Sequence, residues 1–236
     1  MGYLSLAECV RDLETAGHLV RLDHEVDPYL EVAEIQRRVF RAGGPAILFT
    51  RVKGCRFPLL GNLFGTMERV RYIFRDSLEM VAKLATLQVD PADVMRRPRL
   101  YIKAPWWAWY ARPKAVRSGP VLAHETSIDQ LPQIVSWPGD GGPYITLPQV
   151  YTEDPDQPGF DRSNLGMYRI QLGGGKYVPN LDLGLHYQIH RGIAQHHAAA
   201  MRRGVLLRGN IFVGGAPVIT VASLMRLSVW VSVLRL

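Results

Sequence analysis

The stretch Asn164-Leu165-Gly166-Met167-Tyr168-Arg169-Ile170-Gln171-Leu172 leads directly into three glycines and Lys176. Successive side chains would point to opposite faces, as they do on a half-buried β-strand. One face would carry Met167, Arg169 and Gln171, and the other face, with Tyr168, Ile170 and Leu172, would pack inward. An arginine held on a strand is a rigid fork for a phosphate or a carboxylate. The pattern therefore predicts a strand over 166–172 with an anion-binding face.

The glycines at 173–175 predict the turn of a hairpin. We expect the return strand near Tyr187 to Ile189, which would bring His190 back beside Asn164 or Arg169. An amide oxygen and an imidazole nitrogen are both metal ligands, so Asn164 and His190 could share a cation.

Other interpretations of this region remain open. His186 and His190 are four apart, as in a helical zinc pair, but no Glu follows His186 and the flanking glycines disfavour a helix. The run from Gly173 to Lys176 resembles part of a phosphate loop, yet neighbouring positions lack the residues which that motif needs, so a hairpin turn is favoured. An alternating polar strand is also, on composition alone, often an ordinary half-solvated strand.

Helix and strand signals alternate in the first hundred residues. Ser5 to Glu8 is a capping box that opens the first helix. Asp27-Pro28 is expected to open a second helix, which Gly43-Gly44 would end. Expected strands are Leu19 to Leu22, Ala46 to Phe49 and Leu59 to Leu63, and Thr66 and Ser77 are expected caps of two further helices. We expect a compact α/β domain over residues 1–105.

Prolines interrupt the next stretch, so that no continuous element can form there. They stand at 91, 98, 105, 113 and 120, with Trp106, Trp107, Trp109 and Tyr110 among them. These aromatics either form a stacking platform for bases or substrate, or they pin the segment to a core, which is the interpretation that we favour. We place a connector at residues 106–120.

Beyond residue 121 the expected strands shorten and turns multiply. The strands are Ile145 to Tyr151, Gly166 to Leu172, Lys176 to Val178, Gly204 to Arg208 and Asn210 to Gly214, with one helix from Ile193 to Arg202. This pattern indicates an antiparallel sheet or barrel over residues 121–236, and hence an α+β fold class. His196 and His197, on that helix, are expected to have no functional role.

Composition narrows the function classes. The chain has 236 residues, of which 47% are hydrophobic, so it can bury one large core or two small ones. Its net charge of +7 comes mostly from scattered arginines, which favours an anionic ligand or plain solubility over nucleic acid. Cys9 and Cys55 are the only cysteines, and we expect neither a secretion leader nor a membrane helix. A cytoplasmic location is therefore predicted.

Several spaced motifs resemble those of one family. Asn164 to Arg169 followed by His190-Arg191-Gly192 is similar to the cofactor segment of the UbiD decarboxylases, and the run from Trp137 to Thr146 resembles the Trp-Pro-x-Asp segment of that family. Three further motifs resemble the N-terminal domain of that family: Val26 to Glu31, Arg41 to Ala46 and Gly61 to Gly65. The resemblance implies a split β-barrel of the flavin-reductase type in the second domain. It also implies non-oxidative decarboxylation of an aromatic or α,β-unsaturated acid with prenylated FMN, in ubiquinone biosynthesis or aromatic acid metabolism.

The resemblance assigns roles residue by residue. Asn164 and His190 would bind a divalent metal, manganese in the first place with potassium as an alternative, that bridges to the flavin phosphate. The residues that would contact the prenylated flavin are Met167, Tyr168, Arg169, Gln188, Arg191 and Gly192. Arg169 would also act in catalysis, holding the substrate carboxylate and tuning a glutamate proton donor.

The resemblance is expected to end near Met225. The tail 226–236 looks unlike the family, whose sequence continues with a glutamate for the metal site, further glutamates that pair with the strand arginine, and another α/β domain, whereas no acidic residue follows Asp182. We therefore expect little or no decarboxylation by the chain alone. Three possibilities follow: an enzyme completed by a second chain or by a homo-oligomer, a flavin-binding module without chemistry, or an inactive truncated fragment.

Overall fold

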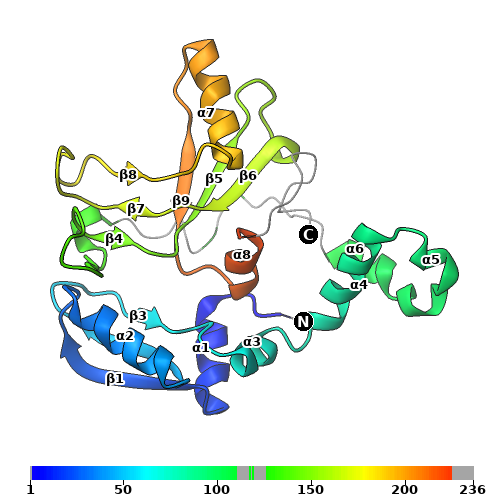
Figure 1. The fold of residues 1–236 in the computed structure, drawn as a ribbon, viewed down its shortest axis with the longest axis horizontal. Helices are drawn as coiled ribbons and strands as arrows, with labels where there is room; N and C mark the ends of the chain where they lie inside the picture. Colours follow the sequence, from blue (N-terminus) through cyan, green and yellow to red (C-terminus); the bar gives the residue numbers. More distant parts are fainter. Residues whose placement is uncertain (1, 111–116, 118, 120–125, 225–236) are drawn as a thin grey trace.

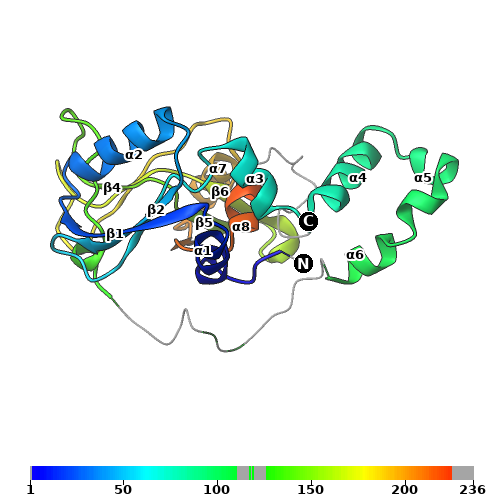
Figure 2. The ribbon, with the colours of Figure 1, turned by 90° about the horizontal axis from the view of Figure 1, so that it is seen from below.

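The computed structural model describes residues 2–110, 117, 119 and 126–224. Three parts follow one another along the chain: an N-terminal α/β unit, a helical arm that projects to one side, and a β-rich unit (Figures 1 and 2). The tail 226–236, which we expected to be unlike the UbiD family, lies outside the described residues.

The N-terminal unit is built on a three-stranded sheet in the order β1-β2-β3. Strands β1 (Leu19–Val26) and β2 (Ala46–Val52) are parallel, β3 (Leu59–Gly61) is antiparallel to β2, and the helices are α1 (Leu6–Thr15), α2 (Glu31–Arg41) and α3 (Met67–Ile73). The predicted caps of α1 and α3 are confirmed, since Ser5 Oγ accepts a hydrogen bond from Glu8 N and Thr66 Oγ1 accepts one from Arg69 N. The α/β character expected for this region is therefore present.

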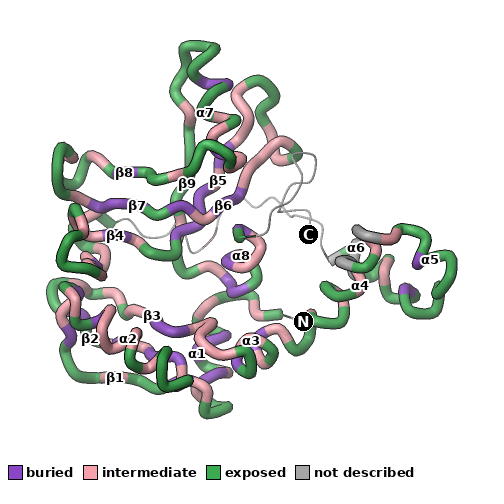
Figure 3. Tube along the Cα trace, in the orientation of Figure 1, coloured by how far each residue is buried: buried purple, intermediate pink, exposed green. Residues whose placement is uncertain are grey.

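Alternation along β2 divides the core of this unit between the two faces of the sheet. Ala46 packs with the buried α1 residues Cys9, Val10 and Leu13, whereas Ile47 and Phe49 pack on the other side with Val32 of α2. Figure 3 shows these buried stretches along the strands and on the inner sides of the helices. One helix on each face thus covers the sheet.

Helix α2 begins later than predicted. It starts at Glu31, not at Asp27-Pro28, because Leu30 adopts a φ of 65° and the backbone before it is used elsewhere. Leu30 N donates to Val135 O at 2.9 Å, and Val135 N donates to Pro28 O at 3.1 Å. The turn before α2 therefore pairs with the β-rich unit instead of starting a helix.

The helical arm consists of α4 (Leu78–Val89), α5 (Asp93–Arg96), the 3₁₀ turn η1 (Pro98–Tyr101) and α6 (Ala104–Tyr110) (Figure 2). As expected from the prolines, no helix runs through the segment: α4 ends before Pro91 and η1 begins at Pro98. The expected packing of the tryptophans against a core is wrong for Trp106 and Trp109, whose exposed fractions are 61% and 67%. An arm of short helices has too little interior to cover such large rings.

The β-rich unit contains two three-stranded sheets, in the orders β4-β7-β8 and β6-β5-β9. Its elements are η3 (Ile128–Gln130), β4 (Tyr144–Ile145), β5 (Gln149–Glu153), η4 (Phe160–Arg162), β6 (Ser163–Met167), β7 (Ile170–Gln171), β8 (Gly184–Leu185), α7 (Gly192–Arg203), β9 (Gly209–Phe212) and α8 (Pro217–Ala222). Every strand pair in the described part of this unit is antiparallel, as expected. Buried residues from both sheets and α7 form its core: Val150, Tyr168, Ile170, Leu172 and Ile193.

Several expected strands differ in the structure. The stretch 166–172 is divided between β6 and β7, and the return strand of the hairpin is β8, not Tyr187 to Ile189. Lys176 to Val178 and Gly204 to Arg208 are not strands. Gly204 instead ends α7 in the left-handed conformation with a φ of 65°, and Val205 N bonds back to Ala200 O, so the chain is used as a helix cap before β9 begins.

Candidate functional site

The two residues between β6 and β7 place adjacent side chains on opposite sides of the backbone. Tyr168 is buried, with 5% of its surface exposed, whereas Arg169 is exposed. Gly166 makes room for the Tyr168 ring, since a Cβ at 166 would lie 2.4 Å from its hydroxyl oxygen. The predicted inward packing of Tyr168, Ile170 and Leu172 is confirmed.

Tyr168 joins Asn164 to the start of helix α7. Its hydroxyl oxygen accepts hydrogen bonds from Asn164 Nδ2 at 3.2 Å and from Ile193 N at 3.5 Å. Gly192 lies so close to Asn164 that a Cβ there would be 2.3 Å from Asn164 Oδ1. The structure thus brings Asn164, Tyr168 and Gly192 together, with the exposed His190 two residues before Gly192.

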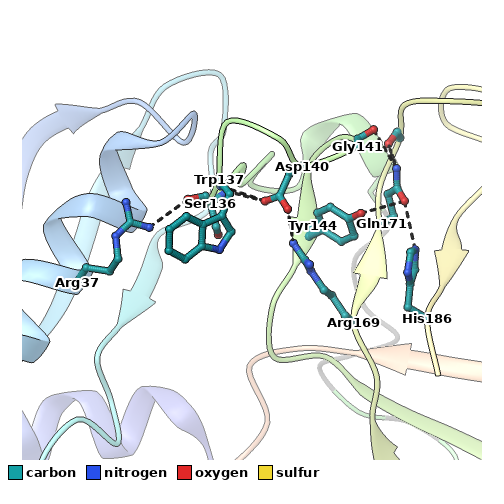
Figure 4. Close-up of polar contacts among 10 residues, drawn as sticks. Arg37, Ser136, Trp137, Asp140, Gly141, Tyr144, Arg169, Gln171 and His186 are labelled. Atoms are coloured by element: carbon teal, nitrogen blue, oxygen red, sulfur yellow. Dashed lines mark hydrogen bonds and ion pairs between the residues drawn. The ribbon is translucent and has the colours of Figure 1, made fainter. Parts of the chain in front are cut away.

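Arg169 lies between a carboxylate and an aromatic ring (Figure 4). Its Nη2 donates to Asp140 Oδ1 at 3.0 Å, and its guanidinium carbon lies 3.6 Å from the centroid of the Tyr144 ring. The side chain remains 45% exposed. A planar cation held at one edge and on one face keeps N–H groups available for an anion in solution.

The Asp140 carboxylate is itself held in place. Its Oδ2 accepts hydrogen bonds from Ser136 N and Trp137 N, both at 3.1 Å, and its side chain is only 10% exposed. Burial acts to raise the pKa of Asp140, but the hydrogen bond and charge of Arg169 and the two backbone N–H groups outweigh it, so the pKa lies below the usual aspartate value. Asp140 is therefore a charged partner for Arg169 at neutral pH.

Gln171 does not share an open face with Arg169, which corrects the expectation from alternation. It is 93% buried, because its Nε2 donates to the carbonyls of Gly141 and Gly173 at 3.0 Å each. Its Oε1 accepts from Tyr144 Oη at 3.1 Å and from His186 Nε2 at 3.2 Å. The amide is thus saturated inside the protein and fixes the Tyr144 ring against the Arg169 guanidinium (Figure 4).

Contacts from α2 reach the same segment. Arg37 Nη1 donates to Ser136 O at 3.1 Å, and the Arg37 guanidinium lies 4.5 Å from the centroid of the Trp137 ring. Together with the backbone pairing of Pro28 and Leu30 to Val135, these contacts form what we call the domain junction. It connects the N-terminal unit to the turn that carries Asp140.

The remaining predicted residues are spread around α7 and β6. Gln188 and His190 are exposed, Met167 and Arg191 are half-buried, and Arg191 is the residue before the first turn of α7. Arg191 N donates to Gln188 O at 3.0 Å, which places a turn immediately before the helix. The sequence alone indicated no role for Asp140, for Tyr144 or for the carbonyl groups that bind Gln171. The Trp137 to Asp140 motif marked the region but not its contact with Arg169.

The donor set fits a flavin nucleotide and a metal ion in its chemistry. The positive end of the α7 dipole, with Arg191 beside it, suits a phosphate. The N–H groups of Ile193 and Ala194 are bonded within the protein, to Tyr168 Oη and Arg191 O, and the close approach of Gly192 to Asn164 leaves no room for a side chain at 192. In the part of the chain that the structure describes, no three His, Cys, Asp or Glu side chains are grouped to hold a metal. A metal at Asn164 and His190 would therefore need oxygen ligands from elsewhere, such as a phosphate. The alternative of a helical zinc pair has no support, because His186 and His190 lie outside any helix.

Two family models match the chain. The N-terminal domain of 3-octaprenyl-4-hydroxybenzoate carboxy-lyase matches residues 10–88, and the Rift-related domain of the same carboxy-lyase matches residues 113–235, which is more than half of the chain. The chain belongs to the UbiD carboxy-lyase family. Residues 226–235, where we expected the resemblance to have ended, lie inside the matched range.

Curated relatives are longer than this chain. An uncharacterised protein of Chlamydia trachomatis is 37% identical over 224 residues, covering 93% of this chain and 37% of the relative. A relative from Chlamydia pneumoniae, named as one subunit of a 4-hydroxybenzoate decarboxylase, is 36% identical over 202 residues, covering 84% of this chain and 33% of the relative. The chain thus spans about a third of the length of these two relatives.

Solved structures of UbiD-class enzymes share the fold. The closed form of vanillic acid decarboxylase from Sedimentibacter hydroxybenzoicus has a TM-score of 0.76 at 23% identity, covering 100% of this chain and 49% of that one. An evolved dimeric form of the UbiD-class enzyme HmfF from Pelotomaculum thermopropionicum, in complex with prenylated FMN, has a TM-score of 0.70 at 27% identity, covering 94% and 47%. None of the described helices is long and apolar enough to cross a membrane.

Proposed function

We propose that this chain provides the cofactor-binding part of a non-oxidative decarboxylase that acts on an aromatic or α,β-unsaturated carboxylic acid with prenylated FMN. The observation that carries the proposal is the pair of adjacent residues between β6 and β7. Arg169 presents a half-exposed guanidinium, while Tyr168 fixes Asn164 and the start of α7 on the other side of the backbone. An anion site and a nucleotide-phosphate site can thus lie on either side of one short segment.

The chain's own residues would bind and orient. Arg169 would contact the flavin, and it would also hold the substrate carboxylate with charge-assisted hydrogen bonds, which fix the direction of the carboxylate as well as its place. The N-terminal turn of α7 with Arg191 and Gly192, together with Met167, Tyr168 and Gln188, would hold the prenylated flavin. Asn164 and His190 would hold manganese at the flavin phosphate. When bound, the prenylated flavin supplies the electron sink that accepts the charge left as carbon dioxide departs.

A partner would complete the enzyme, either as a second chain or as a second copy of this one. One relative is named as a subunit, and a structural neighbour is a two-subunit vanillic acid decarboxylase. The same proposal includes a cytoplasmic location for the protein. It also includes the description of the two antiparallel sheets as a split β-barrel.

The test is a titration of FMN, in the presence of manganese, into the purified chain and into Arg169→Ala. A charge-assisted hydrogen bond to a ligand contributes about 1.5 to 3 kcal/mol, so we expect the substitution to weaken binding roughly tenfold or more. The matched control is Arg202→Ala, which breaks another Arg–Asp pair of the β-rich unit, with Asp156 at 3.3 Å, and should leave FMN affinity unchanged.

Thermal melts of all three proteins would verify that each is folded. If Arg169→Ala and the wild type bind FMN equally well, Arg169 has no part in the cofactor site. If the folded wild type binds neither FMN nor prenylated FMN, the cofactor function is wrong for this chain.

A further inference from the structure

A tight turn is formed by Ser136-Trp137-Pro138-Gly139-Asp140. It buries little apolar surface, since Trp137 is 57% exposed. Its backbone instead holds the carboxylate of Asp140. Asp140 Oδ2 is occupied by Ser136 N and Trp137 N, and Oδ1 is left to receive Arg169 Nη2. The carboxylate is thus oriented before it meets the guanidinium.

We propose that Asp140 is a positioning residue for Arg169, and that the N-terminal unit holds Asp140 in place through the domain junction. The proposal rests on the function proposed above for Arg169. It goes beyond that function because it assigns a role to the Trp137 to Asp140 motif and gives the N-terminal unit an influence on the ligand site.

Two contacts together define the orientation of the guanidinium. Asp140 holds one edge through Nη2, and the Tyr144 ring supports the face at 3.6 Å. The Tyr144 hydroxyl donates to Gln171 Oε1, so the ring cannot swing away without breaking a buried hydrogen bond. An arginine that is already ordered loses less conformational freedom when it binds an anion, which strengthens binding.

The domain junction holds the backbone of the turn that carries Asp140. Arg37 donates to Ser136 O, the carbonyl of the residue whose N–H binds Asp140, and it stacks on Trp137, whose N–H binds Asp140 as well. The neighbouring Val135 pairs with the turn before α2. A chain of direct contacts therefore runs from α2 through residues 135–137 to Asp140 and then to Arg169 (Figure 4).

The diagnostic variant is Asp140→Asn. Asparagine has the same shape and keeps an oxygen that can accept from Ser136 N and Trp137 N. Its amide NH₂ group would then face Arg169, where two donors repel each other. The turn should therefore survive while Arg169 loses its acceptor. Asp156→Asn, which changes the exposed partner of Arg202 in the same way, is the matched control.

A double-mutant cycle with FMN as the probe separates positioning from a general structural effect. If Asp140 acts through Arg169, Asp140→Asn should weaken FMN binding about threefold or more in the wild type and not at all in the Arg169→Ala background, because directly contacting residues are coupled. Asp156→Asn should change neither. An equal loss in both backgrounds would show that Asp140 only supports the fold, and would overturn the proposal.

A second measurement does not depend on the flavin. With ¹⁵N-labelled arginine, the side-chain NMR signal of Arg169, assigned by its loss in Arg169→Ala, should show slower guanidinium rotation in the wild type than in Asp140→Asn. An Arg169 signal that Asp140→Asn leaves unchanged overturns the positioning role, whatever FMN does. Failure of the wild type to bind FMN, with a changed Arg169 signal, would instead refute the proposed function and leave Asp140 as the residue that orders Arg169.

Discussion

Tyr168 and Arg169 show how one peptide unit can serve two purposes at the scale of single residues. Tyr168 is buried over Gly166 and links Asn164 to α7, whereas Arg169 points to the exposed side and meets Asp140. Inversion of side-chain direction from one extended residue to the next is enough to produce this division. A binding group can therefore face the solvent while the backbone that carries it is fixed by its neighbour.

Arg69 shows an arginine used in the opposite way. It is 98% buried, and its guanidinium donates to the carbonyl oxygens of Leu63, Gly44 and Asn62. Burial lowers the pKa of Arg69 from its usual value, but an arginine pKa is so high that the group stays charged. Arg69 is buried and Arg169 is exposed, so exposure decides which of the two arginines can reach a ligand.

The two cysteines should differ sharply in reactivity. Cys9 is fully buried, and burial, followed by the nearby Asp12 charge, raises the pKa of its thiol to about 12, so its thiolate fraction falls by about three orders of magnitude from that of an ordinary cysteine. Cys55 is half-buried. We expect an aromatic disulfide reagent at pH 8 to label Cys55 in the native protein and Cys9 only after unfolding.

The Cys55→Ser variant is the control for that experiment and should show no native labelling. Labelling of both thiols at similar rates in the folded protein would mean that α1 opens readily from the sheet, contrary to the packing of Cys9 against Leu13 and Ala46.

At the scale of elements, the glycine at the start of α7 determines how closely helix and strand approach. A Cβ at position 192 would lie 2.3 Å from Asn164 Oδ1, and Asn164 cannot turn away without losing its hydrogen bond to Tyr168. Overpacking costs about 1 to 3 kcal/mol, and the preference for alanine over glycine in a helix offsets at most about 1 kcal/mol of this. Gly192→Ala should therefore lower the free energy of unfolding by up to about 2 kcal/mol.

Urea unfolding of Gly192→Ala and of Gly173→Ala would test this. Gly173 has open space around its Cβ position, so its substitution should be close to neutral. If Gly192→Ala proves as stable as the wild type, Asn164 and α7 are not packed as tightly as the structure indicates.

The elements also show where sequence patterns succeed and fail. The caps of α1 and α3 and the inward packing of Tyr168, Ile170 and Leu172 were predictable, because they depend on residues within one turn or on side-chain alternation. The division of 166–172 between two sheets was not predictable. β6 pairs with β5, whereas β7 pairs with β4 and β8, and distant partners decide where one strand ends.

The site shows the same limit. The motif of Asn164 to Arg169 identified candidate ligand-binding residues. The local sequence does not indicate that the Gln171 amide donates to the carbonyls of Gly141 and Gly173. It also does not indicate that Asp140, 29 positions away, pairs with Arg169. Contacts between separate turns depend on how the loops close, and the side-chain period of a strand does not contain that information.

At the scale of the whole molecule, the domain junction joins units that each have their own core. It consists of two backbone hydrogen bonds at Val135, the hydrogen bond from Arg37 to Ser136, and the stacking of Arg37 on Trp137. If Arg169 is positioned through the junction, relative motion of the two units would alter the ligand site as well.

We therefore expect Arg37→Ala to destabilise the protein through the junction. Losing the hydrogen bond to Ser136 O and the cation–π contact should cost about 1 to 2 kcal/mol of unfolding free energy. The neighbouring Arg38 is a matched control, because both arginines pair with Glu34 at 2.8 Å, but only Arg37 reaches the β-rich unit. Arg38 is 76% exposed, so Arg38→Ala should cost no more than about 0.5 kcal/mol. Urea unfolding of the two variants gives the comparison. Equal losses would mean that Arg37 contributes only its pair with Glu34, and that its contacts with Ser136 and Trp137 do not stabilise the junction.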